Sequence, residues 1–530
     1  MRRRTTIIAA LLAACTFTRG ADAIPLWEGT AVRGRLLVPT ADPHGARLVR
    51  STINGYLRES YGIELPIAER AEPGGLAIVA GTAETNPTIA QFVKNGLALV
   101  PDALGDEGFQ LLSHAAGGIT YVVVHGKTPR ALKHGCQELV FFRTPASAAH
   151  GEIELPLAVV MTPAIRYRGT YMLPCWSAHD SYESWERVIR FNSELTLNRN
   201  WFWLDGFPLA GHTGEYAGTA LASRENVQRL LDLAHEEDMK ILIGGGWFNW
   251  HHEKAVGKNF EKGVEYYLAY LDAFKRFDGF YIEPTGEGSE INNWRPEGDA
   301  LCDLIAKVHA RQPHMEFALA IGKFNNKEYL ARMAALDPAR VFWWWCWGDP
   351  LRDKALELYP SVLRWHTVVR MSDYHGSMDS PRVEEKALAG IATSYDPGQG
   401  FGNPWNGWGK LGADTARNVD PRTIPYFAHE YFFRERCWNP AARDEEITAR
   451  LQRRLFDADA DPTAAALYVA LSTCVLALNQ GKAPTPTALA PLRAFMTAAG
   501  TRAWTPKMRA SLEFMGEALG QCEQRANRVR

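Results

Sequence analysis

The sequence predicts an α/β protein in which a (β/α)8 TIM barrel follows a small α/β domain and precedes a helical C-terminal region. Three patterns support this. Short strand-like and helix-like stretches mix over residues 31–162, a strand-then-helix repeat covers residues 163–420, and helical patterns alone occupy residues 421–530. Eight strands within about 230 residues, each followed by a helix or a long loop, are typical of a closed parallel barrel.

The first 30 residues are predicted to be an export signal and a linker. Arg2, Arg3 and Arg4 precede an apolar run from Ile7 to Ala14 that is too short to span a bilayer as a helix. Two processing sites compete. Residues 12–15 resemble a lipoprotein box, which would make a lipidated Cys15 the mature N-terminus and a membrane anchor, whereas residues 21–23 fit ordinary signal-peptide cleavage. We favour lipidation, and we expect an exported protein that is periplasmic, an outer-membrane lipoprotein or secreted.

Residues 31–162 contain the elements of a small α/β domain. Gly117 and Gly118 separate two runs that are expected to pair as strands. The predicted strands are 35–38, 75–80, 108–112 and 119–124, and the predicted helices are 46–59 and 128–141.

Residues 163–420 alternate apolar strands with amphipathic helices. No Gly-rich phosphate loop follows the first strand, and we interpret Gly244 to Gly246 as a turn after the third strand. The predicted strands are 167–172, 201–204, 240–243, 279–282, 316–321, 340–345, 365–371 and 390–394. The predicted helices between them include 224–237, 264–276, 300–311 and 327–336, and those after residue 420 are 445–456, 464–478 and 506–522.

The composition is that of a globular protein, and the charge balance does not point to a nucleic-acid partner. Of the 530 residues, 46% are hydrophobic and 22% are charged, as in ordinary globular proteins. The 58 Lys and Arg residues nearly balance the 60 Asp and Glu residues, so no global field points to nucleic acid as a partner. The 17 Trp residues suit stacking on sugars, although core packing accounts for most Trp in any protein.

The eight cysteines do not indicate a metal centre. The chain has no CxxC pair, and the seven cysteines other than Cys15 are widely spaced among mostly apolar neighbours. Buried free thiols are the default interpretation, and one disulfide stays open as an alternative. Adjacent His251 and His252 are weak evidence for a metal, and we predict neither a metal nor an organic cofactor.

The predicted site lies where the barrel strands end, because barrel enzymes bind substrate at the carboxyl ends of their strands. The residues after those ends are acidic, aromatic or amide-bearing, with neither a nucleophile elbow nor a phosphate loop. Such a set suits glycoside cleavage, which needs one protonated carboxyl and one ionised carboxylate across the scissile bond. The candidates are Asp205, Trp247, Asn249, Glu283, Glu287, Lys323, Asp349, Asp373, Tyr374, His375 and Trp405.

The order of these motifs resembles the α-glucuronidases of glycoside hydrolase family 67. The segment from Gly279 to Gly288 is similar to the family's Gly-Phe strand followed by the general acid, and this places the acid on Glu287. Asp349 falls where the family has an Asp that is one of its two general-base carboxylates. The Asp373-Tyr374 pair falls where the family has Glu-Tyr with the other basic carboxylate. The segments Trp438-Asn439-Pro440 and Glu445-Glu446-Ile447 also resemble the family's helical region.

Two departures from the family predict a changed sugar specificity. The family has a lysine four residues before the acid that helps to bind the uronate carboxylate, and here this position is Glu283. A second family lysine, five residues before the Asp at the sixth strand, corresponds to Trp344. A substrate carboxylate beside Glu283 would meet like charge. Lys323 is the remaining cation at a neighbouring strand end.

The resulting hypothesis is an exported glycoside hydrolase that acts on a poly- or oligosaccharide. Glu287 would be the general acid, and Asp373 with Asp349 would activate water, so inversion is expected. The other eight candidates, including Glu283, would bind the carbohydrate. One alternative is a β-N-acetylhexosaminidase-like hydrolase, although such enzymes carry an adjacent Asp-Glu pair at the fourth strand that this sequence lacks. The other alternative is a non-catalytic carbohydrate-binding barrel.

Overall fold

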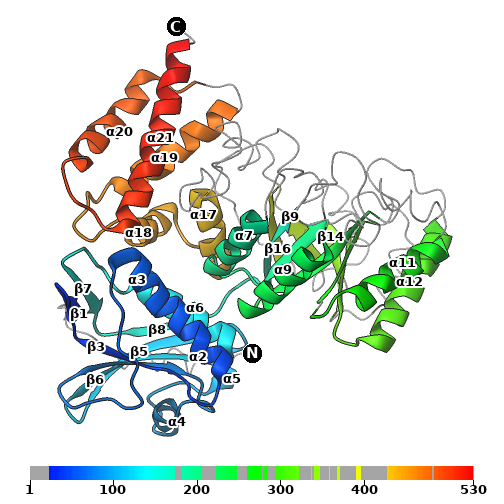
Figure 1. Cartoon of the computed structure of the whole chain (residues 1–530), viewed down its shortest axis with the longest axis horizontal. Coiled ribbons are helices and arrows are strands. Elements are labelled where there is room, and N and C mark those ends of the chain that lie inside the picture. Colours follow the sequence, from blue (N-terminus) through cyan, green and yellow to red (C-terminus); the bar gives the residue numbers. More distant parts are fainter. Residues whose placement is uncertain are drawn as a thin grey trace.

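The computed structural model shows a mixed α/β protein with a helical C-terminal region. Figure 1 shows the N-terminal domain in blue and cyan, the barrel mainly in green, and the C-terminal helices in orange and red. The structure describes residues 23–172, 182–203, 223–246, 260–276, 278–283, 294–320, 336, 340–345, 357, 367–370, 390–395, 427–479 and 483–528.

The N-terminal domain begins with a strand that sequence patterns missed. β1 (Ala23–Glu28) pairs antiparallel with β2 (Ala31–Val32) and with β7 (His150–Glu154). The ring of Trp27 is fully buried, and a Cβ on Gly151 would lie 2.1 Å from that ring. The prediction of a linker up to residue 30 was therefore wrong for residues 23–28, because a short strand next to a signal sequence has too few residues to show a period.

A five-stranded sheet forms the centre of this domain. Its order is β3 (Gly34–Leu37), β4 (Leu76–Gly81), β6 (Ile119–Gly126), β5 (Phe109–Ala116) and β8 (Ala158–Met161). β5 and β6 pair antiparallel across Gly117 and Gly118, which have φ of 59° and 75°, so the predicted strand pair is confirmed.

Helices cover both faces of this sheet. One face packs on α6 (Pro129–Phe142) and on a long helix made of α2 (Pro43–Arg50), the π-helical turn η1 (Ser51–Gly55) and α3 (Tyr56–Tyr61). The other face packs on α4 (Pro87–Lys94), while α5 (Pro101–Leu104) lies in the connection to β5. The alternation along β4 shows the two-residue period of a strand, since Ile78 faces the first core and Val79 the second.

Eight parallel strands form a closed barrel, in the order β10-β11-β12-β13-β14-β15-β16-β9. They are β9 (Tyr167–Met172), β10 (Arg199–Trp203), β11 (Lys240–Gly246), β12 (Gly279–Glu283), β13 (Glu316–Ala320), β14 (Val341–Trp345), β15 (Thr367–Arg370) and β16 (Gly390–Tyr395). All eight predicted strands are confirmed, with ends that differ by up to three residues. The described helices between them are α7 (Tyr182–Glu194), α9 (Arg224–Glu236), α11 (Phe260–Ala273) and α12 (Trp294–Arg311).

The three consecutive glycines do not form a turn, which corrects the sequence interpretation. Gly244, Gly245 and Gly246 are the last residues of β11, and they pair with Tyr281, Ile282 and Glu283 of β12. A Cβ on Gly244 would lie 1.9 Å from the carbonyl oxygen of Tyr281, and its φ is 157°. Glycine is needed here because the neighbouring backbone approaches too closely for any side chain.

The C-terminal region is helical, as predicted. It contains α17 (Phe427–Trp438), α18 (Asp444–Leu455), α19 (Ala464–Asn479), α20 (Pro486–Ala499) and α21 (Pro506–Arg528). All residues of α17 are buried. Its Phe427 ring lies 5.8 Å from Phe191 of α7, and its Tyr431 ring lies 6.1 Å from Phe142 of α6. This helix therefore packs against both the barrel and the N-terminal domain.

Two further features bear on the sequence predictions. The five described cysteines are free, and Cys136, Cys437 and Cys522 are buried. Within the described ranges, none of the helices is both long enough and apolar enough to cross a membrane.

Candidate active site

Parallel pairing brings the carboxyl ends of the eight barrel strands to one rim. Across neighbouring strands, Trp203 pairs with Gly244, Gly246 with Glu283, and Ile282 with Leu319. The register continues around the barrel until Tyr395 pairs with Met172 and the ring closes. The segments that follow the strands therefore all begin at this rim.

The predicted site residues belong to these segments. Glu283 is the last residue of β12, so its backbone is placed at the rim. The remaining candidates lie outside the described residues: Glu287, Asp349, Asp373, Asp205, Trp247, Asn249, Lys323, Tyr374, His375 and Trp405.

The three predicted catalytic carboxylates follow their strands closely in the sequence. Glu287 follows Glu283 by four residues, Asp349 follows Trp345 by four, and Asp373 follows Arg370 by three.

The opposite end of the barrel is closed by a buried ion-pair cluster. Arg199 donates to both oxygens of Glu316, at 2.7 and 2.9 Å, and Lys240 donates to the same carboxylate at 2.5 Å. The guanidinium of Arg199 lies 3.9 Å from the ring centroid of Tyr167. These residues are the first of β9, β10, β11 and β13, and Arg199 and Glu316 stand on non-adjacent strands, so their contact crosses the barrel interior.

This cluster keeps Glu316 ionised. Burial alone would raise the pKa of Glu316, but the charges of Arg199 and Lys240 and their hydrogen bonds outweigh it and lower the pKa to about 2. Burial opposes the charge of Arg199, yet Glu316 raises the pKa of that guanidinium. A carboxylate held this firmly in its charged form is unsuited to donate a proton near neutral pH. Glu316 is therefore structural.

A cavity of about 610 Å³ lies beside this cluster, at the amino ends of the strands. Its lining includes Glu107 and Arg130 of the N-terminal domain together with Arg199, Lys240 and Glu316 of the barrel. Barrel enzymes carry out their chemistry at the carboxyl ends of the strands, so this cavity is at the wrong end for the predicted reaction.

The N-terminal domain meets the barrel at the same amino end. Glu107 forms an ion pair with the fully buried Arg168 of β9 and accepts a hydrogen bond from Asn198 at 2.7 Å. Arg130 of α6 donates to Glu107 at 3.0 Å and to the carbonyl of Asp238 at 2.7 Å. The domain is thus attached opposite the rim that carries the predicted catalytic segments.

The C-terminal region joins this contact through Trp438. Its indole donates to Thr196 at 2.7 Å, and its ring lies 5.3 Å from the ring of His134. Burial lowers the pKa of His134 to about 3 even though Glu107 favours the charged form, so this histidine is neutral near pH 7. The three parts of the chain share one buried polar junction.

Sequence reasoning did not identify these buried charges. The available signal was a charged residue at the first position of a strand, as in Arg199, Lys240 and Glu316. Such a residue also fits an exposed strand end, and only the closed barrel brings the three together. No group of three or more His, Cys, Asp or Glu residues that would hold a metal ion occurs within the described ranges.

Comparison with known proteins identifies the type of fold. No family model matches the chain, and no curated protein matches it. A solved structure titled "Structure of CpGH84D" is similar, with a TM-score of 0.53 and 12% sequence identity over 86% of this chain and 72% of that chain. Its name denotes glycoside hydrolase family 84, so the chain has a fold that is found in a glycoside hydrolase. Membership of family 67, which the sequence motifs suggested, is not shown.

Proposed function

We propose that this protein is an exported glycoside hydrolase whose (β/α)8 barrel cleaves a poly- or oligosaccharide by carboxylate acid/base catalysis. The proposal is supported by the closed parallel barrel, whose strands are followed in the sequence by Glu287, Asp349 and Asp373, and by the similarity of the fold to that of a glycoside hydrolase. Glycoside cleavage uses a pair of carboxyl groups on opposite sides of the bond.

In this proposal Glu287 is the general acid, and Asp373 with Asp349 activates water. Glu283 stands four residues before Glu287 at the end of β12. A nearby like charge raises the pKa of a carboxyl group, as does an environment rich in Trp, and a general acid requires a raised pKa. The altered position 283 also favours a sugar without a carboxylate at this subsite, because a uronate would be repelled.

The central test replaces Glu287 by Gln in the full chain. Loss of a positioned proton donor reduces turnover by about 10² to 10⁴, while the shape of the site is retained. Hydrolysis of a panel of aryl glycosides and oligosaccharides, together with sugar binding by calorimetry, measures both effects. Two matched amide variants should keep most activity: Glu290→Gln, in the same segment after β12, and Asp396→Asn, directly after β16 in the sequence. Full turnover in Glu287→Gln would contradict the assigned acid, and Glu283→Gln is then the next variant to test.

A β-N-acetylhexosaminidase-like hydrolase is the second candidate. It is favoured by one finding: the similar structure is named for family 84, whereas no comparison supports family 67. In such an enzyme the N-acetyl group of the substrate attacks the anomeric carbon, so only N-acetylated sugars are cleaved. The aryl glycoside panel separates the two candidates, and sugar binding without any turnover would identify a non-catalytic barrel.

A further inference from the structure

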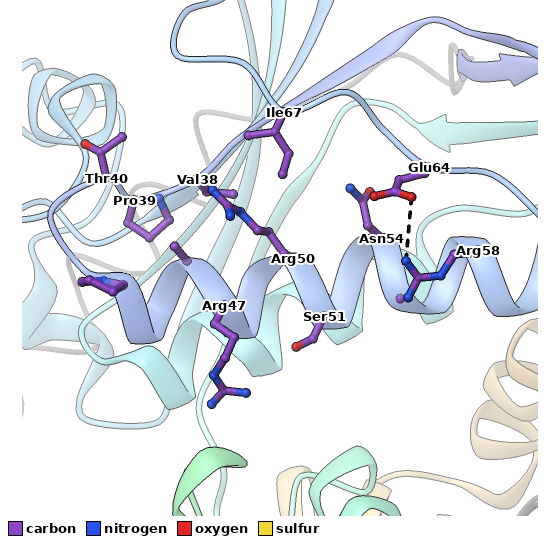
Figure 2. A pocket seen from close by; sticks show the side chains of 13 residues that line it. Val38, Pro39, Thr40, Arg47, Arg50, Ser51, Asn54, Arg58, Glu64 and Ile67 are labelled. Atoms are coloured by element: carbon purple, nitrogen blue, oxygen red, sulfur yellow. Dashed lines mark ion pairs between the residues drawn. The ribbon is translucent and has the colours of Figure 1, made fainter.

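A second groove lies on the N-terminal domain, far along the chain from the barrel rim. It has a volume of about 620 Å³ and is formed by the α2–η1–α3 helix, by residues 38–40 after β3, and by Glu64 and Ile67. Figure 2 shows this helix along one side of the groove and Ile67 with Val38 on the other. The volume lies in the range of pockets that hold small organic ligands.

The helix presents a basic face to this groove. Arg47, Arg50 and Arg58 line it, and Glu64 is its one acidic lining residue. Arg58 and Glu64 approach only to 3.7 Å, and both side chains are more than half exposed, so this pair neutralises little of the charge. Arg47 points away from Ile67 in Figure 2 and donates to the carbonyl of Glu236.

Arg50 is the cation without a protein partner in this groove. Its side chain extends toward Val38 in Figure 2, and it makes no ion pair or side-chain hydrogen bond with any residue in the described ranges. A guanidinium has five donors in a planar fork that matches the two oxygens of a carboxylate or sulfate. Arg50 therefore leaves a complete anion-binding fork free at the groove.

The neighbouring helical turn adds a second, independent feature. Ser51–Gly55 form a π-helical turn inside an otherwise α-helical segment, and such turns occur frequently at functional sites. Asn54 fixes this turn by two hydrogen bonds with the backbone of Leu65, at 3.0 and 3.1 Å. A Cβ added to Gly55 would have no atom within 4 Å, so the turn leaves open space beside the groove.

The opposite wall is apolar. Val38 and Pro39 line it, and Ile67 is 46% exposed, which makes it one of four exposed large hydrophobic side chains in the part of the chain that the structure describes. A sugar ring has one face of C–H groups that suits an apolar wall and hydroxyl groups that suit polar neighbours. Thr40 supplies a hydroxyl group on the same groove.

We propose that this groove binds an acidic unit of a glycan, with the carboxylate or sulfate of the sugar held by Arg50 and its ring against Ile67. The inference rests on the proposed function, because a glycoside hydrolase meets its polysaccharide as a chain longer than the site that cleaves it. The groove retains an acidic chain without cleaving it, and the rim, with Glu283, hydrolyses a sugar of different charge.

Calorimetric titration of the full chain tests the proposal with three probes of equal length: an oligogalacturonate, a sulfated galactan oligosaccharide and a neutral galacto-oligosaccharide. We expect binding of an acidic probe to weaken as the salt concentration rises. At low salt, the neutral probe should bind at least tenfold more weakly than the acidic probe. Arg50→Gln should reduce the affinity for the acidic probe about tenfold or more, as expected for a lost charged hydrogen bond. Ile67→Glu, at an exposed position of the apolar wall, should reduce the affinity for the acidic probe as well.

Arg33→Gln is the matched control, because Arg33 is an exposed arginine of the same domain that pairs with Glu28. It should leave binding unchanged. Binding of the oligogalacturonate alone assigns the anion to a carboxylate, and binding of the sulfated probe alone assigns it to a sulfate. Equal binding of the neutral probe, unchanged binding in Arg50→Gln, or an equal loss in Arg33→Gln would each overturn the proposal.

The same preparation separates this proposal from the proposed function. Glu287→Gln should lose hydrolysis and keep the acidic-probe affinity, whereas Arg50→Gln should lose that affinity and keep hydrolysis of short aryl glycosides. Absent hydrolysis with intact acidic-probe binding contradicts the enzyme assignment alone. Hydrolysis without acidic-probe binding contradicts the groove alone.

Discussion

Glu316 is the residue on which the closed end of the barrel depends. Its carboxylate is almost fully buried and accepts hydrogen bonds from Arg199 and Lys240, so three strands meet on a single negative charge. Removing one partner of a buried ion pair leaves the others without compensation, which costs far more than breaking an exposed pair. The charge of this residue therefore contributes to stability in a pH-dependent way.

Glu316→Gln should destabilise the protein by about 3–5 kcal/mol at pH 7, because the buried Arg199 loses its counter-ion and the partly exposed Lys240 loses an ion-pair partner. The folded-state pKa is lowered to about 2, so this stabilisation is present above the unfolded pKa of about 4.3 and is lost as the pH falls toward 2. Thermal unfolding at pH 7 and pH 3 measures both effects, and the variant should lose less stability between these values than the parent does.

The exposed residue Glu28 gives the control, since it pairs with Arg33 at the surface. Glu28→Gln should change stability by less than about 1 kcal/mol. An equal effect of the two substitutions would show that the buried cluster is not the cause.

The stereochemistry of cleavage tests the proposed roles of Glu287 and Asp373. Inverting enzymes hold their two carboxyl groups about 6.5–9.5 Å apart to admit a water, whereas retaining enzymes hold them about 5–5.5 Å apart. The fourth and seventh barrel strands, β12 and β15, stand on nearly opposite sides of the ring. Asp373 also has a shorter side chain than the Glu that family 67 has at the corresponding position. We therefore expect inversion, measured by proton NMR of the first-formed anomer. A retained anomer would remove Asp373 from the role of base.

At the scale of elements, glycines allow the backbones of β11, β12 and β13 to approach closely. Gly244 and Gly279 both have φ of 157°, and a Cβ on either would lie about 2 Å from a carbonyl oxygen of the next strand, on Tyr281 of β12 and Glu316 of β13. This close packing fixes the position of β12 between its two neighbours.

Gly244→Ala should destabilise the barrel by about 1–3 kcal/mol, because the new methyl group forces the strands apart. Gly520→Ala is the matched control, since Gly520 lies inside helix α21 with no atom within 4 Å of an added Cβ. That substitution should be neutral or stabilise the helix by about 0.5–1 kcal/mol. Thermal unfolding compares the two, and a Gly244→Ala protein as stable as the parent would contradict the close approach.

At the scale of the whole molecule, one polar junction connects all three parts of the chain. Glu107 belongs to the N-terminal domain, Arg168 to the barrel and Trp438 to the C-terminal helices, and the guanidinium of Arg168 lies 5.7 Å from the ring of Trp438. A second ion pair joins Glu138 of α6 to Arg450 of α18 at 2.6 Å. The junction around Glu107 lies at the amino ends of the barrel strands, opposite the rim.

The N-terminus provides a prediction about the whole protein in its compartment. We expect residues 1–14 or 1–23 to be absent from exported material, with either a lipid-bearing Cys15 or an N-terminus at Ile24. Intact-mass spectrometry of the protein from the cell envelope distinguishes the two products. Recovery of an intact Met1 from the envelope would contradict both.

Local patterns were enough to predict the eight barrel strands and many of the helices, whereas the short strands β1, β2, β7 and β8 of the N-terminal domain were missed. A strand such as β11 is marked by the apolar run Ile241–Ile243, and a helix such as α6 by the Thr128 cap, which accepts a hydrogen bond from Ala131 at 3.2 Å. These signals depend on neighbours in sequence, so the order of the barrel strands was also predictable.

Only the tertiary structure decided which distant residues meet. Arg199 and Glu316 are 117 positions apart, and the role of Gly244 depends on a carbonyl of another strand. The same holds for the groove around Arg50, because its far wall comes from residues 38–40 and from Ile67. Such contacts follow from the closure of the barrel and the packing of layers, and the physical reason is that burial and charge pairing depend on distance in space, which no local period of the sequence encodes.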